Sequence, residues 1–98
     1  FIAYRRINIF ELFNEKISTD AEFVAEYSGE MLKCYPESAD LMKWNAAART
    51  ECVAKSRDAS ALVPLIRDLK DYAAASPSPT IDKYLKLAEL MLKNIEND

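Results

Sequence analysis

Hydrophobic residues recur along this chain at the three- and four-residue spacing of amphipathic helices, in five successive segments. The segments run from about Ile2 to Lys16, from near Asp20 to Pro36, from Ala39 to about Lys55, from Asp58 or Ser60 through Tyr72, and from Ser78–Thr80 to about Glu96. Short polar or proline-containing stretches separate them, and short connections make consecutive helices antiparallel. The pattern predicts an all-α fold of two antiparallel helical hairpins and a C-terminal closing helix, as either a stacked superhelix or a closed bundle.

The residues that flank these segments predict where the helices begin. Thr19 and Glu22 have the spacing of a capping box, and Ser38 is the expected N-cap of the third helix. Pro64 is tolerated only near the start of a helix, which favours a fourth helix that begins closer to Ser60 than to Asp58.

The third segment has two apolar stripes about 120° apart when its residues are placed at 100° per step. One stripe contains Leu41, Trp44, Ala48 and Cys52, and the other contains Met42, Ala46 and Val53. A helix with two apolar stripes has two sets of neighbours. Asn45 and Arg49 fall between the stripes, so they are either hydrogen-bonded polar residues at a helix junction or residues that line a groove.

Composition narrows the classes of partner. Thirteen Lys and Arg face sixteen Asp and Glu, for a net charge of −3, and the densest basic cluster is Arg5-Arg6, so we predict no nucleic-acid binding. No apolar run approaches the roughly 20 residues that span a bilayer, which argues against membrane insertion. The length suits a single domain over residues 1–98, complete or cut from a longer helical array, and the sequence gives no compartment.

Residue types that carry chemistry are scarce. Histidine is absent and glycine occurs once, which excludes nucleophile systems built on Ser-His-Asp or Cys-His, histidine-bearing metal sites and glycine-rich phosphate loops. Cys34 and Cys52 are expected to be free, buried thiols, because antiparallel helices would hold them roughly 20 Å apart. Gly29 is expected to mark close helix packing. We predict no catalytic residues, no metal site and no cofactor, and therefore no enzyme.

The last helix carries surplus leucines. Leu87 and Leu90 lie away from its main apolar face. They indicate a contact with another subunit, such as a homodimer through this helix, a following hairpin, or simply scattered exposed apolar residues.

Residues 1–36 and 39–77 resemble a degenerate pair of tetratricopeptide-type repeats, helical hairpins that stack into a superhelix. Each reads as helix, polar turn, helix and proline-marked break, with Asp20-Ala21 and Asp58-Ala59 opening the second helices. Trp44, followed by Ala47-Ala48 and Glu51 in place of the family's Leu-Gly and Tyr, echoes the first-helix signature. Ala59-x-x-x-Val63 echoes the second-helix pattern with a one-residue slip.

The resemblance implies a protein–protein interaction module that binds a peptide or a partner chain in a groove lined by its first helices. Transferred to this chain, the partner-binding residues would be Arg5, Arg6, Asn8, Lys43, Asn45 and Arg49. The alternative is a small helical bundle that holds an apolar ligand in an aromatic-rich interior.

Overall fold

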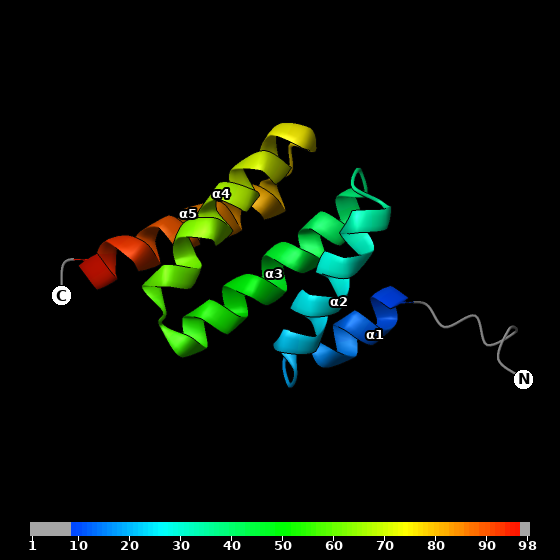
Figure 1. Cartoon of the computed structure of the whole chain (residues 1–98), viewed down its shortest axis with the longest axis horizontal. Helices are drawn as coiled ribbons and strands as arrows, with labels where there is room; N and C mark the ends of the chain where they lie inside the picture. Colours follow the sequence, from blue (N-terminus) through cyan, green and yellow to red (C-terminus); the bar gives the residue numbers. More distant parts are fainter. Residues whose placement is uncertain (1–8, 97–98) are drawn as a thin grey trace, which may run out of the picture.

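The computed structural model describes residues 9–96, which form five helices (Figure 1). The helices are α1 (Ile9–Lys16), α2 (Ala21–Cys34), α3 (Ala39–Ser56), α4 (Ala59–Ala75) and α5 (Pro79–Glu96). The all-α prediction is confirmed, and the described range contains no strand. Within the same range, no helix is long and apolar enough to cross a membrane.

The N-caps of α2 and α3 show how side chains set the helix ends. The Ser38 hydroxyl accepts from the Leu41 N–H at 3.3 Å, as predicted. For α2 the predicted capping box is wrong, because the N-cap is Asp20 and not Thr19. The Asp20 carboxylate accepts from the Phe23 N–H at 3.2 Å, which satisfies one of the free donors of the first turn.

The start of α4 is set by Asp58, whose carboxylate accepts from the backbone N–H and the hydroxyl of Ser60 at 3.0 and 2.6 Å. These bonds lower the pKa of the Asp58 carboxyl. The helix therefore begins at Ala59, slightly earlier than Pro64 suggested. Pro64 lies in the second turn, where it leaves the Ser60 carbonyl without its usual N–H donor.

The closest helix pairs are α2 with α3 and α4 with α5, and α3 also packs against α4 and α5. The sequence had suggested hairpins of α1 with α2 and of α3 with α4, so the closest pairing is shifted by one helix. With eight residues, α1 is short and offers α2 little surface. Figure 1 shows α4 running away from α3 after the turn that joins them.

Two apolar cores lie on different sides of α3. The first holds Met42, Ala46 and Val53 with Leu62, Leu65, Leu69, Ile81 and Ala88. The second holds Leu41 and Ala48 with Phe13 and Val24, and Trp44 packs at its edge. The two-stripe prediction for α3 is thus confirmed.

Both cysteines are free, as expected. Cys34, however, is exposed, because it is the last residue of α2 and lies outside both apolar cores; its predicted burial is wrong. Cys52 is partly buried, and burial, aided by the charge of Glu22, raises the pKa of its thiol. Leu87 and Leu90 are 41% and 54% exposed, so the described helices leave them uncovered.

Phe13 fixes α1 to the rest of the fold. Its side chain is fully buried, and its ring meets those of Trp44 and Tyr27 edge to face, with centroids 5.8 and 6.1 Å apart. It is the buried residue of α1, and the partly buried Ile9 and Phe10 pack on the same core, so Phe13 is the main but not the sole anchor of this helix.

We expect Phe13→Ala to lower the free energy of unfolding by about 3 kcal/mol, because it empties a closed site in the second core. Leu12→Ala removes a partly exposed neighbour and should cost about 1 kcal/mol or less. Urea denaturation followed by circular dichroism measures both. Equal losses in the two variants would contradict the anchoring role of Phe13.

Candidate functional site

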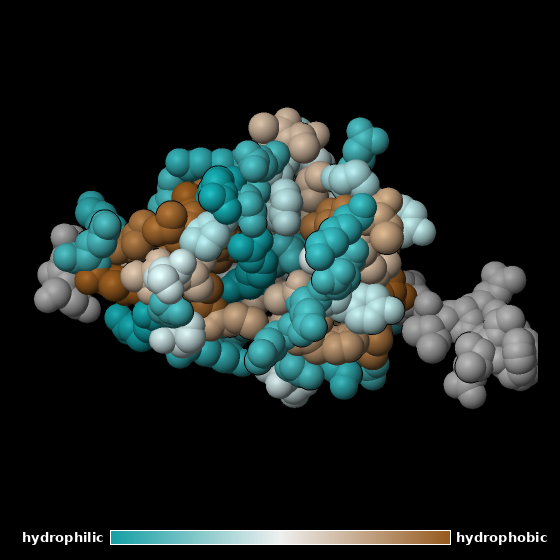
Figure 2. Space-filling model, in the orientation of Figure 1, coloured by the Kyte–Doolittle hydropathy of each residue, from teal (hydrophilic) through white to brown (hydrophobic). Residues whose placement is uncertain are grey.

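A groove of about 380 Å³ lies across α3, between α2 and α4. It is lined by Ala25, Glu26, Gly29, Glu30, Leu32, Lys33, Asn45, Arg49, Asp68 and Tyr72. Figure 2 shows hydrophilic residues in the hollow between the two halves of the molecule. This is the α2–α4 groove, and its floor is polar although a core lies on each side of α3.

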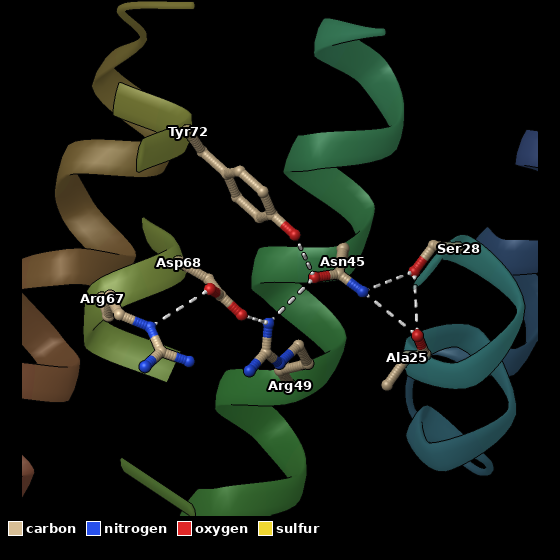
Figure 3. Close-up of polar contacts among 7 residues, drawn as sticks. All are labelled: Ala25, Ser28, Asn45, Arg49, Arg67, Asp68 and Tyr72. Atoms are coloured by element: carbon tan, nitrogen blue, oxygen red, sulfur yellow. Dashed lines mark hydrogen bonds and ion pairs between the residues drawn. The ribbon is translucent and has the colours of Figure 1, made fainter. Parts of the chain in front are cut away.

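Asn45 joins the three helices of the groove through its side-chain amide (Figure 3). Its Nδ2 donates to the Ala25 carbonyl and to the Ser28 hydroxyl, both at 3.1 Å. Its Oδ1 accepts from the Tyr72 hydroxyl at 2.8 Å and from Arg49 Nη1 at 3.4 Å. A carboxamide has two N–H donors and two lone pairs, so the hydrogen-bonding capacity of Asn45 is used in full.

Arg49 and Asp68 add an ion pair between α3 and α4. Arg49 Nη1 lies 2.7 Å from Asp68 Oδ2, and the two side chains are 25% and 34% exposed. Arg67 Nε approaches the other Asp68 oxygen at 3.9 Å from a largely exposed position. Because it is partly shielded from water, the Arg49–Asp68 pair is stronger than an ordinary surface pair. With Ser28, Asn45 and Tyr72 it forms what we call the Asn45 network.

Ser28 and Gly29 form the α2 side of this network. The buried Ser28 hydroxyl donates to the Val24 carbonyl at 2.6 Å, which leaves its lone pairs to accept from Asn45. A Cβ added at Gly29 would meet Asn45 Nδ2 at 3.6 Å, an ordinary contact. Gly29 therefore faces α3 at ordinary packing distance, and a methyl group in its place has room.

Tyr72 closes the network from α4. Burial is the main cause of the raised pKa of its phenol, with a smaller contribution from the carboxylates of Asp68 and Asp71, while the Arg49 guanidinium acts in the opposite direction. The neutral, hydrogen-bond-donating phenol is thus the form that the fold favours.

The structure brings together only part of the predicted partner-binding set. Asn45 and Arg49 lie side by side, and both line the groove. The sequence left open whether Asn45 is a hydrogen-bonded residue at a helix junction or a residue that lines a groove, and in the structure it is both. Lys43 is not among the lining residues, since two helical steps turn it to the far side of α3. Arg5, Arg6 and Asn8 lie outside the described residues.

Sequence reasoning missed three members of the network: Ser28, Asp68 and Tyr72. A signal existed on α4, where Asp68 and Tyr72 repeat the i, i+4 spacing of Asn45 and Arg49 and offer a complementary acceptor and donor. Ser28, a small polar residue amid the apolar positions of α2, was a weaker signal.

No protein-family model, curated protein or solved structure matches this chain. Among residues 9–96, no group of three or more Cys, Asp or Glu side chains is placed to hold a metal ion. The groove combines charged side chains, the two small residues Ala25 and Gly29, and a hydrogen-bonded floor.

Asn45→Ala should lower the free energy of unfolding by about 2–3 kcal/mol, because it leaves several polar groups without their partner, whereas Tyr72→Phe removes one bond and should cost about 1 kcal/mol. Asn45→Ala already removes the acceptor of the Tyr72 hydroxyl. The loss of stability in the double variant should therefore be smaller than the sum of the two single losses, by at least about 0.5 kcal/mol. Urea denaturation gives all three values.

Tyr84→Phe is the matched control, because the Tyr84 hydroxyl makes no hydrogen bond to a described residue and should not affect stability. Strict additivity between Asn45 and Tyr72 would show that their bond contributes nothing.

The pKa of Tyr72 predicts a specific sensitivity to alkali. Its folded-state pKa is raised, so the unfolded chain loses the phenolic proton first as the pH rises. The stability that Tyr72 supplies is complete below pH 10, its ordinary pKa, and is lost above it. The stability difference between wild type and Tyr72→Phe should therefore shrink in urea titrations carried out above that pH. A difference that stays constant with pH would rule this out.

Proposed function

We propose that this chain is a protein-interaction module that receives an extended peptide segment of a partner in the α2–α4 groove. The observation that carries the proposal is the groove itself, built from three helices and lined on its floor by the Asn45 network. The resemblance to tetratricopeptide-type hairpins remains a prediction and leads to the same class of function.

The shape of the groove favours a chain over a small enclosed ligand. Its volume of about 380 Å³ is in the range of ligand sites, yet it lies open on the surface (Figure 2). Ala25 and Gly29 keep side-chain bulk off part of the α2 wall, so a peptide backbone has room to approach there, between the longer side chains of Glu26, Glu30, Leu32 and Lys33. Arg49 and Tyr72 place polar groups beneath it.

The stiffness of the groove also supports recognition. The Asn45 network joins α2, α3 and α4 by side-chain hydrogen bonds, so the walls are held in place before a partner arrives. Binding to a preorganised surface avoids the entropy cost of ordering it.

The alternative, an apolar ligand in an aromatic interior, has less support. A cavity between α3, α4 and α5 has a volume of about 110 Å³ and a mixed lining. Apolar residues such as Val53, Leu62 and Met91 line it together with Arg57 and Asn94. Ligand pockets usually measure roughly 300–1,000 Å³. No aromatic side chain lines this cavity.

Gly29 provides a direct test. Peptides that bind wild type can be selected from a randomised phage-displayed library, and their affinities measured by fluorescence anisotropy. Gly29→Trp puts an indole into the groove and should weaken binding by at least about tenfold, a change of about 1.4 kcal/mol.

Gly29→Ala is the matched control. It adds only a methyl group, so it should keep the affinity and raise the free energy of unfolding by about 0.5–1 kcal/mol through better helix propensity. Thermal melting monitors whether Gly29→Trp still folds. Selected peptides that bind a folded Gly29→Trp as well as wild type would refute the groove proposal.

A further inference from the structure

Two glutamates form a ridge between the α2–α4 groove and a neighbouring aromatic surface. Glu26 and Glu30 line the groove, and with Phe23 and Tyr27 they also line a shallow, largely apolar depression on the other side of α2. The spacing i, i+4 places the two carboxylates on one face of the helix, within reach of a single cationic group.

The ridge itself carries more negative than positive charge. Its two carboxylates, those of Glu26 and Glu30, face one cation among the groove-lining residues, Lys33. Asp68 is offset by Arg49, at 2.7 Å, and is also approached by Arg67. Lys33 Nζ lies 3.2 Å from Glu30, but both side chains are mostly exposed, so water screens this pair. Glu26 has no hydrogen bond or ion pair with any described residue.

The aromatic surface beside the ridge suits a cation as well. Tyr27 is 45% exposed, and its ring lies 5.5 Å from that of Phe23. Lys16 Nζ already lies 5.8 Å from the Phe23 ring centroid, a cation–π contact within the chain. Because Lys16 already engages the Phe23 ring, the partly exposed Tyr27 ring is the aromatic surface that remains for a partner's cation beside Glu26 and Glu30.

We infer that the partner of this module is a basic peptide segment, with an arginine or lysine side chain over the Glu26–Glu30 ridge and against Tyr27. The rest of the segment enters the α2–α4 groove. This inference rests on the proposed function and specifies the partner's chemistry: an acidic segment would meet the uncompensated charge of Glu26, and an uncharged one would leave the ridge unused.

The phage-displayed selection tests the inference through peptide composition. Peptides enriched on wild type should contain more arginine and lysine than the starting library, and raising the salt concentration should weaken their binding. Enriched peptides that are neutral or acidic would overturn the basic-partner inference. If such peptides still lost binding in Gly29→Trp, the groove function would stand; peptides indifferent to Gly29→Trp would overturn both.

Charge-neutral variants supply the second measurement. Glu26→Gln with Glu30→Gln should weaken a selected basic peptide about tenfold, while a peptide with citrulline or norleucine in place of its basic residue should bind both proteins equally. The control is Glu89→Gln with Glu96→Gln, which makes the same charge change at exposed positions of α5 away from the groove. Equal loss in both double variants, or none in either, would refute the role of the ridge.

Discussion

The Asn45 carboxamide is the interaction on which this arrangement depends. Apolar cores occupy two sides of α3, and the strip between them carries a polar side chain that is 3% exposed. Such a group is costly to bury unless every donor and acceptor is paired. The pairs exist only when α2 presents the Ala25 carbonyl and Ser28 while α4 presents Tyr72. Satisfying Asn45 therefore fixes the positions of α2 and α4 relative to α3, and with them the width of the groove.

This constraint separates two kinds of residue at the groove. Asn45 has no hydrogen-bonding capacity left for a partner, so its contribution is to position the walls. Arg49 is different: its hydrogen bonds to Asn45 and Asp68 are both donated by Nη1, and its guanidinium has further N–H groups. Glu26 and Glu30 are freer still, because they lie on the rim and are exposed. We therefore expect the rim residues Glu26 and Glu30 to contact a bound partner, and Asn45 on the floor to hold the helices in place.

The sequence predicted what depends on local spacing and missed what depends on distant partners. The two stripes of α3 and the Ser38 cap follow from periodicity and from hydrogen bonds three residues long, and both were correct. The predicted N-cap of α2, Thr19, was wrong by one position: Asp20 is the N-cap, and both residue types have side chains that can cap a helix. Lys43 was assigned through a family analogy, although two helical steps separate it from the face of Asn45.

The network itself could not be read from one sequence. Asn45 bonds to residues 17, 20 and 27 positions away, and nothing local to α3 specifies them. The hairpin assignment failed for a related reason. Antiparallel neighbours follow from short loops, but which neighbours pack most closely depends on helix length and on apolar surface, and α4 diverges from α3 while it packs along α5.

The α2–α4 groove and the exposed leucines of α5 lie on different parts of the molecule. Residues of α2, α3 and α4 line the groove, and α5 contributes none. Leu87 and Leu90 belong to α5, which is joined to the groove only through its packing on α3 and α4. A second copy of the chain bound at these leucines would not need any groove residue. Self-association through α5 would therefore be compatible with the proposed peptide binding between α2 and α4, and substitutions at either surface would leave the other intact.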